Sequence, residues 1–141
     1  MIRLAISKGR ILREGLEILN KIGIVCSLDP LNCRKLIIPT NDKNIEIVII
    51  KATDVPLYID SGKVDIGIVG IDTLLEDETD NHYRLKDLGI SLCKLVVAGK
   101  PGKKYFNNMK IATKYPNATK KYFEKIGLQC SILKLYGSIE L

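Results

Sequence analysis

The stretch IEIVIIKATDVPLYIDSGKVDIGIVGID, residues 45–72, holds the pattern that decides the fold. The apolar run IEIVIIK predicts a strand that delivers Lys51 to its end. Asp54 can cap the helix that follows, whose first turn accommodates Pro56 and which stops at Gly62. VDIGIVG then predicts a second strand. Strands that alternate with helices predict an α/β domain with a largely parallel sheet.

The same alternation extends in both directions from this stretch. RKLIIPT and IEIVIIK, separated by a turn-like cluster at 41–44, predict a hairpin or two neighbouring strands. Periodicity predicts further strands at 2–6, 92–99, 109–114 and 130–137, and further helices at 11–22, 72–77 and 117–127. Gly23 and Gly127 are placed to end the first and last of those helices.

Polar and charged residues gather where the predicted strands end. Ligands of such sheets bind beyond the carboxyl ends of the strands, so we single out SKGR at 7–10, KATD at 51–54, GID at 70–72, TKY at 113–115 and GSIE at 137–140. Gly9 would let backbone N–H groups approach an anion, and Lys8 and Arg10 would add full charges. A tight turn with solvated side chains explains the same spacing equally well. Neither a dinucleotide fingerprint nor a P-loop is present.

Composition excludes several classes of protein. The chain has 141 residues, 46% of them hydrophobic and 27% charged, which is typical of a globular domain. No apolar run is long enough to span a bilayer and the N-terminus has no signal-peptide pattern, so we expect a cytoplasmic protein without a membrane partner. The single histidine, His82, lies in a polar loop and is expected to be solvated. The cysteines lack C-x-x-C spacing and are expected to be reduced thiols packed as small hydrophobes: Cys26, Cys33, Cys93 and Cys130.

The positive charge is concentrated in the last third of the chain. Residues 100–141 contain nine lysines and two acidic residues, whereas residues 1–99 are nearly balanced. This asymmetry suits a nucleic-acid face, an anionic ligand or a solvated surface. Tyr122, Phe123 and Ile126 fall at core-like helical spacing, so we expect them to be buried rather than available for stacking on bases, and we expect no nucleic-acid partner.

In order and spacing, the stretches LAISKGRIL, RKLIIPT, ATDVPLYIDSGKVDIGIVGIDTLLE, DLGISLCKLVVAG, KIATKYPN, YFEKIG and LKLYGSIEL resemble the ATP phosphoribosyltransferases that open histidine biosynthesis. The likeness is to the short form of that family. It implies a two-lobed fold like that of type II periplasmic binding proteins. The first lobe would be residues 1–92 and the second residues 93–141, beginning with the strand through Leu95 to Ala98.

The resemblance also implies a reaction and roles for residues. N1 of ATP would displace pyrophosphate from C1 of phosphoribosyl pyrophosphate, with Mg²⁺ accompanying the substrates. Arg10 and Arg34 match the arginines that face the leaving group, and no residue is assigned as a metal ligand. The predicted substrate-binding set is Lys8, Gly9, Lys51 (usually Arg in relatives), Asp54, Asp72 near the nucleotide, Lys114, and Glu140 near the ribose.

Partners and completeness are likewise implied by the family. Short-form chains form homodimers that assemble with a regulatory subunit resembling histidyl-tRNA synthetase. Relatives continue with a D-x-x-x-T-G-x-T-like loop that grips the 5′-phosphate, whereas this sequence stops at Leu141. We therefore expect a fragment with an incomplete second lobe and return crossing, and inefficient catalysis. The alternative is a non-catalytic nucleotide-binding module of receptor-like fold.

Overall fold

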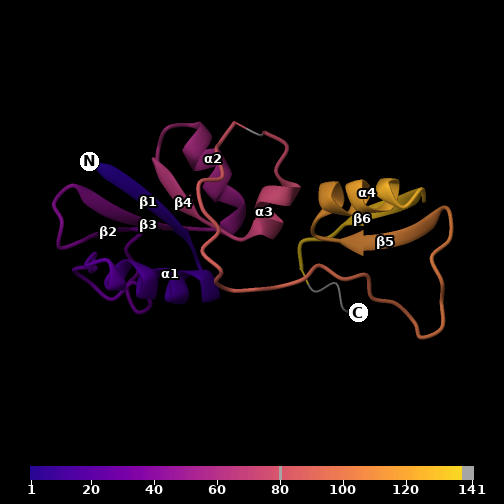
Figure 1. Cartoon of the computed structure of the whole chain (residues 1–141), viewed down its shortest axis with the longest axis horizontal. Coiled ribbons are helices and arrows are strands. Elements are labelled where there is room, and N and C mark those ends of the chain that lie inside the picture. Colours follow the sequence, from indigo (N-terminus) through magenta and orange to yellow (C-terminus); the bar gives the residue numbers. More distant parts are fainter. Residues whose placement is uncertain (80, 138–141) are drawn as a thin grey trace. The chain divides into compact units, whose positions relative to one another are not determined.

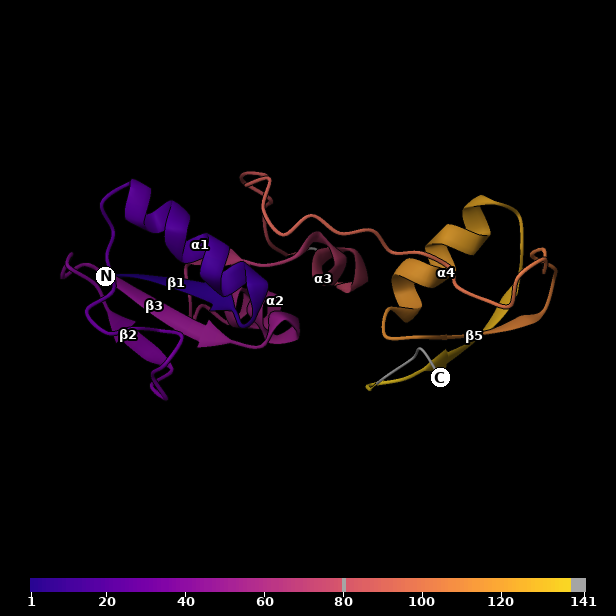
Figure 2. The same cartoon turned by 90° about the horizontal axis from the view of Figure 1, so that it is seen from below.

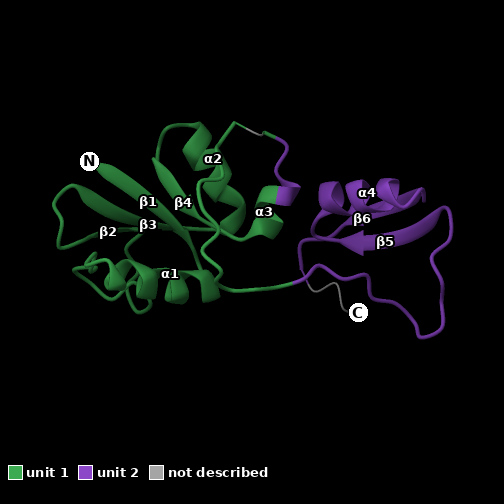
Figure 3. Cartoon of the chain, in the orientation of Figure 1, with its two compact units in different colours: residues 1–74, 79–93 green, residues 75–78, 94–141 purple. Residues whose placement is uncertain are grey.

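The computed structural model describes residues 1–79 and 81–137, which divide into two compact units (Figure 3). Unit 1 comprises Met1–Leu74 and Thr79–Cys93, and unit 2 comprises Leu75–Glu78 and the chain from Lys94 onward. Both are mixed α/β structures, as the alternating pattern predicts.

Unit 1 is built on a four-stranded sheet in the order β2-β3-β1-β4. The parallel strands are β1 (Ile2–Ser7), β3 (Ile45–Ile50) and β4 (Ile66–Ile68), with β1 in the centre. The short strand β2 (Ile37–Pro39) runs antiparallel to β3, so the predicted hairpin is confirmed. Pro39 falls on this edge strand, where a residue without an N–H is tolerated.

Helices cover both faces of this sheet (Figure 1). The helix α1 (Arg10–Lys21) packs on one face, and the 3₁₀ turn η1 (Ala52–Asp54) leads into α2 (Val55–Asp60) on the other. A third helix, α3 (Ile71–Glu76), follows β4. The predicted helix stops at Gly23 and Gly62 have positive φ angles of 83° and 65°, which glycine adopts without strain. None of the helices in the described part of the chain is long and apolar enough to cross a membrane.

Alternation along β1 fills two separate cores. Leu4 and Ile6 pack with Leu12 and Leu19 of α1, whereas Ala5 packs with the cluster that includes Val48, Val55 and Val64. A central parallel strand is covered on both faces, so nearly all of its residues must be apolar. The buried part of β1, with the sequence LAIS, is apolar except for its last residue, Ser7.

Unit 2 contains a parallel pair of strands, β5 (Met109–Thr113) and β6 (Cys130–Lys134), covered by α4 (Pro116–Lys125) (Figure 2). Phe123 is only 1% exposed and makes edge-to-face contacts with the rings of Tyr105 and Tyr122. Its predicted burial is confirmed. Tyr122 and Ile126 are 45% and 43% exposed, so their predicted burial is wrong. A pair of strands offers α4 a narrow surface, and only the centre of the helical stripe reaches it.

The strand expected at 92–99 is not formed. Neither sheet of the described residues includes this segment, and Leu95 and Val96 are 52% and 78% exposed. A strand exists only when its backbone N–H and C=O groups pair with a neighbour. Apolar composition alone predicted a strand here, and the described part of unit 2 supplies no partner for it.

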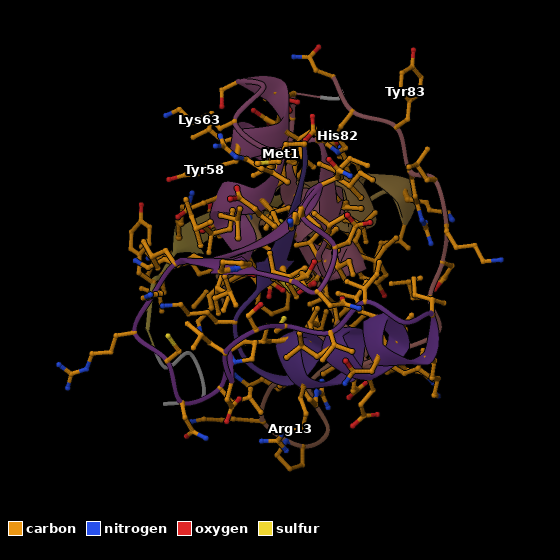
Figure 4. The ribbon with its side chains drawn as sticks, turned by 90° about the vertical axis from the view of Figure 1, so that its left-hand side faces the viewer. Met1, Arg13, Tyr58, Lys63, His82 and Tyr83 are labelled. Atoms are coloured by element: carbon orange, nitrogen blue, oxygen red, sulfur yellow. The ribbon has the colours of Figure 1, made fainter. Side chains whose placement is uncertain are left out.

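Two expectations about single side chains are also corrected. Cys93 is exposed, while Cys26, Cys33 and Cys130 are partly buried free thiols as predicted. His82 is not solvated, because its side chain is 13% exposed and its Nδ1 lies 3.7 Å from Oδ1 of Asp60 at the end of α2. Tyr83 beside it points outward (Figure 4). The polar loop folds back over α2, a contact that sequence pattern does not reveal.

Candidate substrate site at the carboxyl edge of unit 1

The parallel register carries two of the predicted cations to one edge of the sheet. Ser7 at the end of β1 lies beside Ile50 at the end of β3, and the Lys8 N–H donates a hydrogen bond of 3.1 Å to the Ile50 carbonyl. Lys8 and Lys51, the next residue of each strand, therefore leave the sheet from neighbouring positions. Both side chains are exposed.

The turn after β1 has the backbone geometry that anion recognition needs. Gly9 has φ 96°, and nothing lies within 4 Å of where a Cβ would be. It precedes Arg10, the first residue of α1, and no side-chain hydrogen bond from this N-cap position reaches the helix. The twelve-residue helix directs the positive end of its dipole toward this turn. The turn thus combines open space, an exposed guanidinium and a helix N-terminus.

Arg34 reaches the same edge through the antiparallel strand. The Ile49 N–H donates a 2.8 Å hydrogen bond to the carbonyl of Leu36, so the chain entering β2 lies beside the end of β3. Arg34 is two residues before Leu36 and is exposed. Because β2 runs opposite to β3, its beginning lies at the carboxyl edge of the parallel strands. Topology therefore gathers Lys8, Arg10, Arg34 and Lys51 at one side of unit 1.

Two acidic residues of the predicted set belong to this edge as well. Asp54 ends η1 directly after β3, and its Oδ1 accepts a 3.1 Å hydrogen bond from Thr53 Oγ1. Its predicted N-cap position at the start of α2 is confirmed, but its side chain makes no capping hydrogen bond. Asp72 lies in the first turn of α3, and its carboxylate folds over Gly70, where an added Cβ would collide with it.

The other two predicted residues are not part of the described edge of unit 1. Lys114 follows β5 in unit 2 and is exposed. Glu140 lies outside the described residues. A shallow groove in unit 1, between α1 and residues 25–31, is lined by none of the predicted site residues. Arg13 borders that groove and points away from the sheet (Figure 4).

Two polar residues, at the ends of β1 and α3, were missed by sequence reasoning. Ser7 is 1% exposed, and its hydroxyl finds no hydrogen-bond partner among the described residues. A serine closing an apolar strand was the available signal. Glu76, at the end of α3, accepts hydrogen bonds from the first turn of α4. Its partners are 41 and 42 residues away in sequence, so no local pattern points to them.

The residues at the carboxyl edge of unit 1 have features in common that suit one class of ligand. Four exposed cations, a glycine turn and a helix N-terminus share the carboxyl edge of a parallel α/β sheet. Such an edge attracts multiply charged anions, and guanidinium groups bind phosphate oxygens in pairs. The described edge of unit 1 thus has features suited to a phosphorylated ligand.

Comparison with known proteins identifies the family. The sequence model of HisG, ATP phosphoribosyltransferase, matches residues 51–141. The ATP phosphoribosyltransferases of Ruthia magnifica and Methylococcus capsulatus are 48% and 46% identical to the whole chain, which covers 69% and 67% of their lengths. In the ATP phosphoribosyl transferase (HisG:HisZ) complex from Thermotoga maritima, one chain matches with a TM-score of 0.67 and 30% identity, and this chain covers 66% of it.

The chain belongs to the ATP phosphoribosyltransferase family. The function expected from the sequence, the transferase reaction that opens histidine biosynthesis, is confirmed at the level of that family. The chain spans about two thirds of the length of the relatives it matches.

Proposed function

We propose that this chain performs the substrate-binding part of ATP phosphoribosyl transfer at the carboxyl edge of unit 1. The single observation that carries the proposal is the parallel register of β1 and β3, which puts Lys8 and Lys51 directly after neighbouring strand ends, with Arg10 at the start of α1 and Arg34 just before β2. The substrates would be ATP and phosphoribosyl pyrophosphate. Both are polyanions, so their approach to one another needs fixed cations that offset their repulsion.

The reaction assigns the arginines a specific task. The bond from C1 of the ribose to the pyrophosphate oxygen breaks while N1 of ATP forms its bond to C1. Negative charge grows on the departing pyrophosphate, and guanidinium groups already in place stabilise that charge more than they stabilise the substrate. Arg10 and Arg34 would supply this stabilisation. Lys51 would contribute a point charge, and Asp72 would contact the nucleotide.

Mg²⁺ would be bound mainly through the substrates. Magnesium is commonly held by one or two carboxylates together with substrate phosphates. The described residues contain no group of three side chains suited to hold a metal ion by themselves. Asp54 and Asp72 at the strand edge would supply these one or two carboxylates. The ion would then offset phosphate charge while the cations of the edge orient the complex.

The wider architecture follows from the same proposal. The two compact units would correspond to the two lobes of a type II periplasmic-binding-protein-like fold, with the second lobe completed by sequence that the longer relatives contain. The Thermotoga maritima structure is a complex of HisG with HisZ. We propose that this chain forms a homodimer and assembles in the cytoplasm with a HisZ-like regulatory subunit.

Calorimetric titration with ATP–Mg²⁺ and with phosphoribosyl pyrophosphate–Mg²⁺ tests the proposal. The wild-type chain should bind both, and Arg10→Ala or Arg34→Ala should weaken binding of phosphoribosyl pyrophosphate about tenfold, the usual loss for one charged hydrogen bond. Arg13→Ala is the matched control because Arg13 borders the separate groove, and it should leave both affinities unchanged. Equal affinities for all four proteins would contradict the proposal.

A second function predicts a different outcome of the calorimetric titration. If the chain is a nucleotide-binding module without catalysis, ATP should bind while phosphoribosyl pyrophosphate does not. A chain extended by the remaining third of a relative should then still form no phosphoribosyl-ATP.

A further inference from the structure

The first turn of α4 has a complete set of hydrogen-bond partners. Pro116 has no N–H, and the N–H groups of Asn117 and Ala118 donate to Oε2 of Glu76 at 2.9 and 3.0 Å. The Thr119 N–H donates to the Tyr115 carbonyl at 2.9 Å. Helices normally begin with several unpaired N–H groups. In α4 the Glu76 carboxylate takes the two that an N-cap side chain or a bound anion would otherwise take.

A second contact locks the same pair of residues. The Asn117 side-chain amide donates through Nδ2 to the backbone carbonyl of Glu76 at 2.9 Å. The side chain of each residue therefore bonds to the main chain of the other, Glu76 to Asn117 and Asn117 to Glu76. We call these four hydrogen bonds to Glu76 the Glu76 clamp. The Asn117 N–H donates to both carboxylate oxygens, the Ala118 N–H donates to Oε2, and Asn117 Nδ2 donates to the backbone carbonyl.

Because of the Glu76 clamp, the N-terminus of α4 is not available to an anionic ligand. The positive end of a helix attracts anions, and a carboxylate placed there satisfies it as a phosphate would. In α4 that place is filled by Glu76. In α1 the N-cap is Gly9, which has no side chain to offer. Phosphate recognition by unit 2 must then use side chains rather than the amides of α4.

The cation of unit 2 that was predicted to bind substrate is Lys114, which is exposed and lies in the turn just before α4. Thr113 Oγ1 accepts the Tyr115 N–H at 3.0 Å and lies 3.2 Å from the Thr119 hydroxyl on α4. The turn 113–115 is thus tied to the first turn of α4 on both sides of Lys114. Any shift of the helix start moves this lysine.

We propose that Glu76 is a positioning residue: an internal anion that fills the N-terminus of α4 and thereby holds the Thr113–Tyr115 turn so that Lys114 is fixed for binding a phosphate group at unit 2. The inference deepens the proposed function, on which the role of Lys114 rests. The clamp itself rests only on the geometry of unit 2.

Hydrogen exchange tests the clamp without reference to catalysis. In Glu76→Ala the amides of Asn117 and Ala118 should exchange at least about tenfold faster than in the wild type, the factor for one lost charged hydrogen bond. Added formate, a free carboxylate, should restore protection in Glu76→Ala and change nothing in the wild type. Glu78→Ala removes the same charge from an exposed neighbour and should exchange like the wild type. Unchanged protection in Glu76→Ala, or no effect of formate, would overturn the clamp.

A binding cycle tests the positioning role. Pyrophosphate affinity is measured for the wild type, Glu76→Ala, Lys114→Ala and the double variant. Glu76→Ala should weaken binding several-fold when Lys114 is present and have no effect when Lys114 is already alanine. Additive losses would contradict positioning. Glu76→Gln keeps an acceptor oxygen and should recover part of the affinity, and it replaces Glu76→Ala in the cycle if the alanine variant does not fold.

The two experiments separate the failure of this inference from that of the proposed function. A wild-type chain that binds no pyrophosphate refutes the proposed function and with it the role of Lys114, while the exchange data still decide the clamp. Binding by the wild type with an additive cycle refutes the positioning role alone.

Discussion

At the scale of single residues, Ser7 is the buried polar end of the strand β1. Its hydroxyl has no partner among the described residues, and a buried polar group without a hydrogen bond lowers stability by about 1–3 kcal/mol. Ser7→Ala removes this cost and leaves a small void. We predict that its free energy of unfolding, measured with urea, equals that of the wild type or rises by up to about 1 kcal/mol.

A matched exchange at the surface provides the control. Ser131→Ala alters an exposed position of β6 and should change stability by less than about 0.5 kcal/mol. If Ser7→Ala instead lost more than about 1 kcal/mol, the hydroxyl would be bonded in the folded chain and the description of this strand end would be wrong.

The four thiols differ in environment, and two of them differ enough to be told apart. Burial raises the pKa of the Cys26 thiol above its ordinary value, so its reactive thiolate forms only at higher pH. Cys93 is exposed. At about pH 8 we predict that iodoacetamide modifies Cys93 several times faster than Cys26, as read by peptide mass spectrometry. Equal rates would mean that residues 24–28 open readily from α1.

At the scale of elements, α2 rests on β4 through a glycine. A Cβ on Gly67 would lie 2.5 Å from Val55 Cγ1 and 2.9 Å from Ile59 Cδ1, so Gly67→Ala forces α2 outward. Overpacking of this kind costs about 1–3 kcal/mol. We predict a loss of that size in urea unfolding. Gly99→Ala, where nothing lies within 4 Å, should be neutral or slightly stabilising. Equal stability of the two variants would contradict the packing of α2 on β4.

Local signals predicted most of these elements, and tertiary pairing decided the remainder. Glycines at 23, 62 and 127 end their helices because they adopt positive φ, a property of the residue itself. The segment 92–99 has the composition of a strand, yet a strand depends on a neighbour that composition does not specify. The exposure of Tyr122 likewise depends on how wide a sheet α4 covers.

At the scale of the whole molecule, the strand edge that carries the candidate site in unit 1 was predictable, because the parallel topology of the sheet forms it. Parallel strands bring their carboxyl ends to one edge, so residues that follow β1 and β3 had to meet there. The antiparallel strand brought Arg34 to the same edge. The Glu76 clamp was not predictable, because it joins segments about 40 residues apart through hydrogen bonds that leave no periodic trace.

The chain is shorter than its matched relatives, and this difference leads to a prediction about its transferase activity. About a third of the length of each matched relative lies outside the part that this chain covers. Catalysis requires every phosphate to be held in register with the attacking nitrogen, and losing such positioning costs about 10²-fold or more. We predict that the 141-residue chain forms phosphoribosyl-ATP at least about 100-fold more slowly than the same chain extended with the remaining third of a relative. Comparable rates in an absorbance assay of product would refute this.

The central claim is that the carboxyl edge of unit 1 is a polyanion site, and amide chemical-shift mapping with pyrophosphate tests it most directly. We expect saturable shifts at Lys8, Gly9, Arg10 and Lys51, and weaker binding of pyrophosphate in Arg10→Ala. Shifts confined to the groove beside α1, or the absence of any shift at the ends of β1 and β3, would contradict it.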